Sequence, residues 1–174
     1  MLVDPYGNYF CQKLFKVLDF EERLTFIQKI KDSVEFIGTD QIGAHSFQNL
    51  ISGLCNIQER QLMVLVIQDS FKNIINDKLG VHIVERLIIC FDEGLITNLY
   101  ELVLENFIEY ANDATTLCVV RFTFNNTKIR KIVSFCQDEN TKKRIINILV
   151  KNYEVLVNNP YGNFSIQEGI DVKA

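Results

Sequence analysis

Apolar residues recur along the chain with the spacing of an amphipathic helix, and in the first half of the chain the stripe returns after 36 and then 37 residues. Counted from a glycine, the apolar positions are the fourth, seventh and eighth residues after it, which share one face of a helix. The pattern predicts a helix after each glycine, with the glycine as the turn residue before it. The glycines are Gly7, Gly43, Gly80 and Gly162, and the stripes are Cys11, Leu14 and Phe15; Phe47, Leu50 and Ile51; Val84, Leu87 and Ile88; and Ile166, Gly169 and Ile170.

A second helix follows each of the first three helices, and a short third segment follows in the first two copies. In the first copy, Leu24, Ile27 and Ile30 mark the apolar face of the second helix. Only 8 glycines and 2 prolines leave few turns, which favours helices over a β-sandwich. Because one such repeat cannot bury its apolar face alone, stacked repeats of three helices predict an α-solenoid. The second helices are expected at 21–31, 58–71 and 95–107, and the short segments at 34–37 and 73–77.

The fourth repeat fits two registers. One starts at Thr116, because the lead-in at 107–113 repeats the one at 71–77. The other starts at Asn125, which lies 37 residues before the last glycine. An insertion is expected within 114–140 in either case, and we take Thr116 as the working register. The first register has Cys118 and Arg121 at its two outer positions, and the second has Ile129, Ile132, Val133 and Cys136 on its apolar stripe.

The residue two after each glycine carries a flat ring. These residues are Tyr9, His45, His82 and Phe164, and they include both histidines of the chain. A ring is common to all four positions and a titrating group is not, so a row of stacking surfaces is a better interpretation than a catalytic or metal site. The competing interpretation is that the rings pack between neighbouring helices.

Amide side chains accompany the rings. Asn8 and Gln12 are four residues apart on one helix, so their amides project from the same face. Each amide offers one acceptor and two donors, and two amides beside a ring can hold the edge and the face of a planar base. The competing interpretation is a solvated helix face, or a helix cap in the case of Asn8. A cap does not explain why glutamine recurs five residues after the glycine at Gln48 and Gln167.

Composition and charge restrict the function. The net charge is −4 and the pI is about 5.2, whereas a strong phosphate binder usually has a basic face. The 5 cysteines are scattered without a C-x-x-C pair, so we expect buried free thiols and a reducing, cytoplasmic location. We expect no membrane span, signal peptide, metal or cofactor, because the chain lacks the patterns that each requires.

The motif Gly-Asn-Tyr-x-x-Gln, returning at about 36 residues, resembles the repeats of the Pumilio (PUF) family, which bind single-stranded RNA. DPYGNYFCQKLF at 4–15 and NNPYGNFSIQEG at 158–169 are similar to the uracil-reading repeats of that family. IGAHSFQNLI at 42–51 and LGVHIVERLI at 79–88 are similar to its other internal repeats. The resemblance covers nearly the whole chain and is weakest in the fourth repeat.

The resemblance implies an all-α fold: a right-handed superhelical α-solenoid of the Pumilio and armadillo-like type. It would be crescent-shaped, with RNA on the concave face at about one base per repeat. Residues 1–174 would form a single partial Pumilio-type domain, because the family usually has more repeats, so we expect part of a longer or split protein. The repeats are placed at about 1–32, 33–70, 71–106, 107–152 (with the insertion) and 153–174 (truncated).

Roles are carried over by position. The resemblance implies that Asn8 with Gln12, and Asn163 with Gln167, bind the Watson–Crick edge of uracil. It also implies that Gln48 faces a base without a polar partner, since the residue at the asparagine position is Ala44. The four rings would stack on bases, and in the fourth repeat Cys118 and Arg121 would take the base-contacting positions.

The third repeat is expected to differ from the first. Glu85 only accepts hydrogen bonds, which suits guanine, although Val81 offers no polar partner beside it. The provisional RNA element is 5′-U-N-G-N-U-3′. Lys13 and Arg86 are expected to contact phosphates, or else to lie on a solvated face. The Ser-Asn-x-x-Glu repeat that reads the guanine of a UGU core in the family is absent.

Three classes of function compete. The first is binding of U-containing single-stranded RNA, in messenger 3′ untranslated regions, for post-transcriptional repression with protein co-repressors on the convex face. Neither membrane nor DNA is an expected partner. The alternative is a degenerate solenoid that serves as a protein-interaction scaffold, which the acidic charge, Ala44 and Val81 favour. An enzyme is the third, and we expect none, because the chain lacks the common catalytic motifs.

Overall fold

The computed structural model describes residues 1–116 and 139–171. The chain divides into two compact bodies, Met1–Ile96 and Thr97–Ala174, and each is described by itself. We call them the N-terminal body and the C-terminal body. All regular structure in the described residues is helical. The prediction of an all-α fold built from three-helix repeats is therefore confirmed for this part of the chain.

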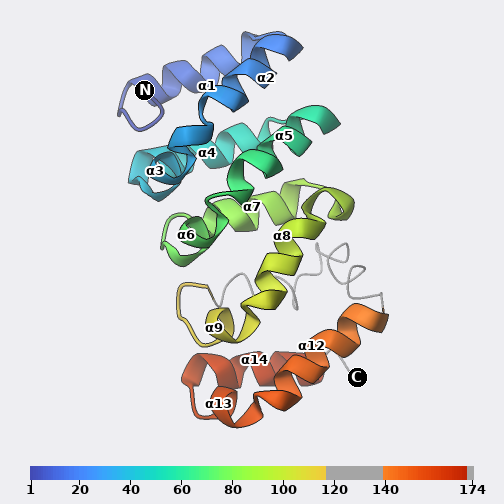
Figure 1. The fold of residues 1–174 in the computed structure, drawn as a ribbon. Helices are drawn as coiled ribbons and strands as arrows, with labels where there is room; N and C mark the ends of the chain where they lie inside the picture. Colours follow the sequence, from blue (N-terminus) through green and yellow to red (C-terminus); the bar gives the residue numbers. More distant parts are fainter. Residues whose placement is uncertain (117–138, 172–174) are drawn as a thin grey trace. The chain divides into compact units, whose positions relative to one another are not determined.

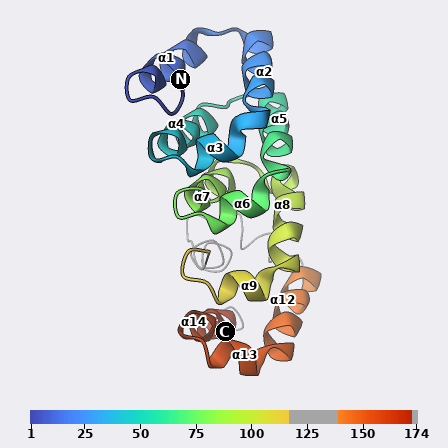
Figure 2. The ribbon, with the colours of Figure 1, turned by 60° about the vertical axis from the view of Figure 1, so that its left-hand side comes forward.

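The N-terminal body consists of layers of equivalent helices (Figures 1 and 2). One layer holds the helices that follow the repeat glycines, which lie side by side in chain order. A second layer holds the helices that come next in each repeat, and a third holds the short ones. The first layer is α1 (Gly7–Val17), α4 (Gln41–Ser52) and α7 (Val81–Cys90); the second is α2 (Phe20–Lys29) and α5 (Ile57–Gln68); the third is α3 (Val34–Thr39), preceded by η1 (Lys31–Ser33), and α6 (Phe71–Asn76).

The C-terminal body repeats the same order of helices. A long helix and a short helix come first, and a second pair follows residue 138. The last helix begins at the second Pro-Tyr-Gly sequence and packs against the short helices α9 and α13 (Figure 1). The helices are α8 (Glu93–Glu105, which crosses the division of the bodies), α9 (Phe107–Ala111), α12 (Glu139–Lys151), α13 (Tyr153–Val157) and α14 (Pro160–Asp171).

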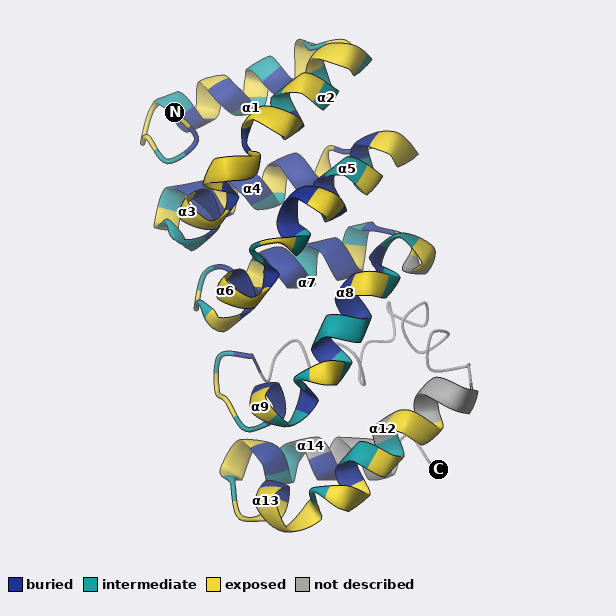
Figure 3. Ribbon diagram, in the orientation of Figure 1, coloured by how far each residue is buried: buried dark blue, intermediate teal, exposed yellow. Residues whose placement is uncertain are grey.

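The predicted apolar stripe forms the core of the N-terminal body. Figure 3 shows buried residues along the faces of α4 and α7 that meet their neighbours. Phe47, Ile51 and Leu87 are fully buried, and Leu14 is the only member of the three stripes in this body that is half-buried. Burying a side chain of this size contributes about 1.5–3 kcal/mol, so stacking repeats supplies most of the stability of each helix.

Each repeat starts with a carboxylate or amide cap that sequence analysis did not predict. Three residues before each repeat glycine, an Asp or Asn Oδ1 accepts hydrogen bonds from the backbone N–H groups two and three residues further on. These bonds satisfy N–H groups that have no partner at the start of a helix. The acceptors are Asp4, Asp40, Asp77, Asp113 and Asn159, at 2.5–3.2 Å.

The repeat glycines are needed for close packing. The prediction that they are turn residues is wrong, because none of the described glycines has a positive φ and Gly80 has helical angles. A Cβ at Gly43 would collide with the carbonyl oxygen of Ile37, and one at Gly80 with that of Ile74. In each case the carbonyl lies six residues earlier, in the short helix. The glycine therefore lets the short helix approach the start of the next one.

The cap and the glycine position together fix the register of the fourth repeat. Asp113 caps the backbone N–H groups of Thr115 and Thr116 at 2.8 and 3.0 Å, as the other caps do in their repeats. Thr116 then occupies the glycine position, and its Oγ1 donates to the carbonyl oxygen of Tyr110, six residues earlier, at 2.7 Å. These contacts place the repeat at Thr116. The rival anchor Asn125 lies outside the described residues.

Helix boundaries differ from the predicted ones by a few residues. The second helix of the second repeat ends at Gln68, because Phe71 already begins the short helix α6. Likewise Phe107 begins α9 instead of ending α8. Both phenylalanines are buried and continue the apolar pattern across the boundary between the two helices, so the pattern does not reveal that boundary. The repeat boundaries themselves stay a prediction.

The cysteines agree only in part with expectation. Cys11 is buried, and burial raises the pKa of its thiol, but Cys55 is exposed, so the prediction of buried thiols is wrong there. Cys118 and Cys136 lie outside the described residues. Within the described residues, no helix is long and apolar enough to cross a membrane, and no cluster of His, Cys, Asp or Glu could hold a metal ion.

Candidate nucleic-acid interface

Rings are exposed at equivalent positions on three helices that lie side by side. Tyr9 on α1 is 66% exposed, His82 on α7 has a side chain that is 53% exposed, and His45 on α4 is also exposed. The interpretation that these rings pack between helices is therefore wrong in the N-terminal body. Exposing an apolar ring to water is unfavourable, so a row of exposed rings indicates a binding surface. The faces of these rings are surfaces on which flat molecules can stack.

The Asn8 amide of the first repeat is bonded within the protein. Its Nδ2 donates to the carbonyl oxygens of Asp4 and Pro5, both at 2.8 Å, and the residue is only 5% exposed. Its Oδ1 accepts from Gln12 Nε2 at 3.2 Å. The cap interpretation of Asn8 is wrong, because the N-cap of α1 is Tyr6 and the Asn8 amide donates to loop carbonyls instead of accepting from helix N–H groups.

The Gln12 amide bridges two repeats. Its Nε2 donates to Asn8 Oδ1 at 3.2 Å and to Ser46 Oγ on α4 at 3.3 Å. Its Oε1 accepts from Asn49 Nδ2, also on α4, at 3.2 Å. Gln12 is half-buried and therefore lies at the edge of the surface, where a ligand can reach it.

The second repeat has fewer polar groups at these positions. Ala44 is 2% exposed and supplies packing only, as expected. Gln48 is half-buried beside the exposed His45. On α7, Ile83 and Arg86 stand where α4 has Ser46 and Asn49. Within the described residues, the Gln48 amide makes no hydrogen bond to α7 of the kind that holds Gln12.

The third repeat pairs its ring with its carboxylate. His82 Nδ1 lies 2.7 Å from Glu85 Oε2, one turn along α7. The Glu85 side chain is 13% exposed, and Val81 is buried. With one oxygen held by the imidazole, the carboxylate keeps one oxygen outside this contact. Guanine offers two N–H donors, so full pairing with guanine would place one of them on the oxygen that the imidazole already contacts.

The remaining predicted positions lie in or beyond the C-terminal body. Cys118 and Arg121 fall outside the described residues. Asn163 and Phe164, on α14, are half-buried, so this ring is less accessible than those of the N-terminal body. The side chain of Gln167 falls outside the described part of α14.

Few fixed charges lie near the rings. Lys13 is exposed on α1 and Arg86 is half-buried on α7, each one residue after the last polar position of its repeat. Asp4 lies at the start of α1, and hydrogen bonds from the backbone N–H groups of Gly7 and Tyr6 lower its pKa from the ordinary value. The surface can therefore stack and hydrogen-bond, with little net positive charge.

The curated relatives of this chain include Pumilio domain-containing proteins. No protein-family model matches it. Suppressor protein MPT5 of Saccharomyces cerevisiae is 28% identical over 184 residues, which is 99% of this chain and 20% of MPT5. The Pumilio domain-containing protein C4G8.03c of Schizosaccharomyces pombe is 37% identical over 54 residues, 31% of this chain and 7% of that protein.

Solved structures agree with these relatives. The RNA-binding domain of yeast Puf5p bound to MFA2 RNA superposes with a TM-score of 0.81 at 27% identity, over 99% of this chain and 46% of that one. The chain is therefore similar in sequence to Pumilio domain-containing proteins and in fold to the Puf5p RNA-binding domain. The Puf4 RNA-binding domain, at 18% identity and a TM-score of 0.76 over 98% of this chain and 50% of its own, shares the fold. The chain thus spans about half the length of these Pumilio structures and less of the curated relatives.

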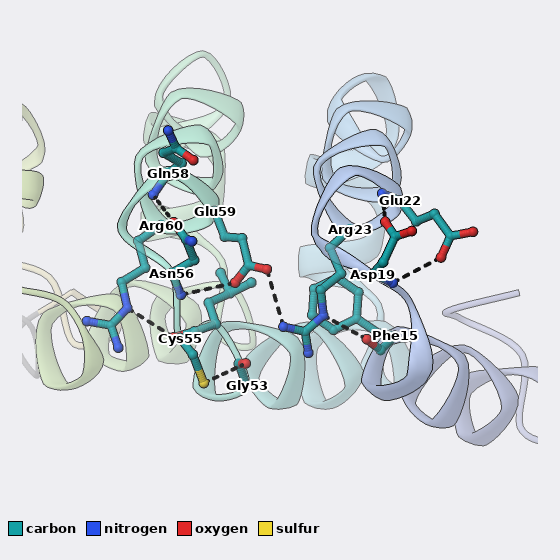
Figure 4. Close-up of polar contacts among 11 residues, drawn as sticks. Phe15, Asp19, Glu22, Arg23, Gly53, Cys55, Asn56, Gln58, Glu59 and Arg60 are labelled. Atoms are coloured by element: carbon teal, nitrogen blue, oxygen red, sulfur yellow. Dashed lines mark hydrogen bonds and ion pairs between the residues drawn. The ribbon is translucent and has the colours of Figure 1, made fainter.

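A largely buried ion pair joins the first two repeats, and sequence analysis missed it (Figure 4). Arg23 Nη1 donates to Glu59 Oε1 at 3.2 Å, its Nε donates to the Phe15 carbonyl oxygen at 2.9 Å, and the guanidinium lies 4.6 Å from the Phe15 ring centre. Glu59 is 1% exposed and also caps α5 by accepting from the backbone N–H of Asn56. The pair fixes α2 against α5.

The same joint recurs at the next repeat in a looser form. Arg60 Nε donates to the Leu54 carbonyl oxygen at 3.0 Å, and its Nη1 lies 3.6 Å from Asp92 Oδ2. Arg60 stands 37 residues after Arg23, so the repeat period could have revealed the pair. Neither the period nor the composition indicates that the acid partner comes from the following repeat.

Proposed function

We propose that α1, α4 and α7 bind single-stranded RNA at about one base per repeat, with uracil-containing messenger RNA as the target. The observation that carries the proposal is the row of exposed rings, Tyr9, His45 and His82, on helices that lie side by side. The relatives add support, because the Puf5p and Puf4 domains were solved with RNA bound. We further propose that binding represses messenger RNA in the cytoplasm without catalysis, and recruits co-repressor proteins.

Stacking supplies most of the proposed affinity. Base–aromatic stacking contributes about 1–3 kcal/mol per base. Gln12 adds a hydrogen bond to the base edge in the first repeat, and Glu85 adds one in the third. The proposed element is 5′-U-N-G-N-U-3′. With a net charge of −4 and few cations near the rings, the salt dependence of binding should be shallow for a nucleic-acid binder.

Fluorescence anisotropy with labelled 5′-U-N-G-N-U-3′ oligonucleotides tests the proposal at about 50 and 200 mM salt. Tyr9→Ala should weaken binding by about 5- to 100-fold, because one stacking face is lost. Tyr153→Ala is the matched control, since Tyr153 is 52% exposed on α13 and outside the row. An affinity that Tyr9→Ala combined with Asn163→Ala leaves unchanged would contradict the proposal. Absence of RNA binding, with a protein retained instead, would favour the scaffold alternative.

A further inference from the structure

Ser46 and Asn49 hold the Gln12 amide of the neighbouring repeat in one of its two possible orientations. A glutamine amide can be turned over, which exchanges its oxygen and nitrogen, so its orientation follows from its partners. Here the partners form a chain that starts at fixed backbone groups. The carbonyl oxygens of Asp4 and Pro5 accept hydrogen bonds only, so the nitrogen of the Asn8 amide must face them.

The rest of the chain follows from this start. With its nitrogen facing the carbonyls, Asn8 presents its oxygen to Gln12, so Gln12 must present Nε2. Ser46 Oγ, which is fully buried, accepts the second N–H of Gln12. Gln12 Oε1 then faces Asn49, which donates to it at 3.2 Å. Turning Gln12 over would set its oxygen against Asn8 Oδ1, a repulsive contact in place of a hydrogen bond, and would keep the Asn49 contact only if Asn49 turned over as well.

The orientation of this amide determines which pyrimidine it can pair with. On its Watson–Crick edge uracil offers the O4 acceptor beside the N3–H donor, whereas cytosine offers the N4–H donor beside the N3 acceptor. For a base stacked in one position, the two patterns require opposite orientations of the glutamine amide. In the observed orientation, the second lone pair of Gln12 Oε1 can accept a hydrogen bond from a donor on the base. Gln12 Nε2 can donate to an acceptor on the base once it leaves Ser46.

We propose that Asn49 is a positioning residue that makes the first repeat select uracil over cytosine, while Ser46 holds the Gln12 nitrogen until the base replaces it. The proposal rests on the proposed RNA binding and adds that the base preference of one repeat is set by side chains of the next. Of the two contacts from α4, the Ser46 contact is the longer, at 3.3 Å, and is the one exchanged for the base. The second repeat lacks such an arrangement, since Ile83 and Arg86 replace the two positions.

The first test compares uracil and cytosine at each end of the 5′-U-N-G-N-U-3′ oligonucleotide, one end at a time, with the full chain. Wild-type protein should prefer uracil at one end by about tenfold, the usual value of a two-bond base contact. Asn49→Asp replaces the donor facing Gln12 with an acceptor and should turn the amide over. The uracil-to-cytosine ratio should then fall by about tenfold at that end only. Asn49→Ala should lower it less.

Matched controls separate positioning from general damage. Asn76→Asp makes the same charge change at an exposed residue of α6 and should leave the ratio unchanged. Ser46→Ala removes the acceptor that competes with the base, so uracil should bind about threefold more tightly. A ratio that Asn49→Asp leaves unchanged while uracil binding persists would overturn the proposal.

A second measurement needs no RNA, so failure of the proposed function can be told from failure of this inference. Side-chain amide NMR signals of Gln12, assigned with Gln12→Glu, should be displaced from those of a solvated glutamine and should move in Asn49→Asp. Gln48 signals should stay in place. Gln12 signals at solvated positions in wild-type protein would overturn the inference whatever the RNA result.

Discussion

The first and third repeats of the N-terminal body use the same helical positions in different ways. In the first repeat, the Gln12 amide is held by Asn8 of its own helix and by Ser46 and Asn49 of the next. In the third, Glu85 is held by His82 of the same helix. The polar group expected to contact a base is thus held by the following repeat in the first repeat, and by a ring on the same helix in the third repeat. Changes that loosen repeat stacking should therefore affect the first repeat more than the third.

The largest expected effect comes from breaking the joint between the first two repeats. Arg23→Ala would leave Glu59, which is 1% exposed, buried without its cation. Removing one partner of a buried pair typically costs about 3–5 kcal/mol. Urea unfolding followed by circular dichroism measures the loss. Base selection at the first repeat should weaken, and selection at the third should not.

An exposed ion pair provides the control for this variant. Arg144 and Glu101 pair in the C-terminal body at 2.8 and 3.0 Å, and the hydrogen bond from Arg144 lowers the pKa of Glu101. Because both side chains are exposed by 40% or more, Arg144→Ala should cost at most about 1 kcal/mol. Equal losses in the two variants would contradict the distinction between a buried joint and a surface pair.

The third repeat can be destabilised without altering its reading pair. Gly80→Ala places a Cβ against the Ile74 carbonyl oxygen, so α6 and α7 must separate slightly. Such overpacking typically costs about 1–3 kcal/mol. Since His82 and Glu85 share α7, the base preference of the third repeat should persist. Gly94→Ala is the control, because nothing lies within 4 Å of a Cβ there, and it should raise stability by about 0.5–1 kcal/mol.

The difference between the first and third repeats can also be tested by removing the contact between His82 and Glu85. His82→Phe keeps a stacking ring and removes the nitrogen that engages Glu85 Oε2. Both carboxylate oxygens can then accept from guanine, so the preference for guanine over adenine should rise about three- to tenfold. Competition binding with the middle base varied measures this. His45→Phe, on a helix with Gln48 in place of the carboxylate, should not change the guanine preference.

The smallest effect concerns the start of the first helix. Backbone N–H groups of Gly7 and Tyr6 lower the pKa of Asp4 from 3.8, so the ionised group favours the folded state. This contribution is complete above the unfolded pKa and is lost as pH falls through the lower folded pKa. Asp4→Asn mimics Asn159, which caps without titrating. Thermal unfolding should favour wild type at about pH 7, and the difference should shrink as the pH falls below the ordinary pKa of 3.8.

Much of the fold follows from sequence because packing repeats the same spacing. Phe47, Leu87 and their equivalents are apolar at fixed distances from a glycine, and that periodicity predicts both the helices and their stacking. The exposed rings could be predicted because Tyr9, His45 and His82 share one position but no common chemistry other than a ring.

Other features of the structure depend on contacts between residues whose pairing cannot be inferred from the repeat spacing. Asp113 recurs at the cap spacing, but the fourth repeat has Thr116 in place of the glycine that marks the other repeats. The Asn8 amide faces inward because two loop carbonyls need donors, which no spacing rule indicates. Contacts between repeats, such as Gln12 with Asn49, require knowing which helix faces belong together.

The capped starts of the repeats have a consequence for exchanging parts of the protein. The cap, the glycine position and the carbonyl it approaches all lie within seven consecutive residues, as in 37–43 and 74–80. The residues that position one helix against the next are therefore contiguous in sequence, and they are transferred together when the segment is moved. A segment that begins at one short helix and ends just before the next therefore contains the complete set of these residues at its N-terminal end. Grafting 34–70 in place of 71–106 should preserve stacking while transferring the Ser46 and Asn49 side chains that orient the preceding glutamine.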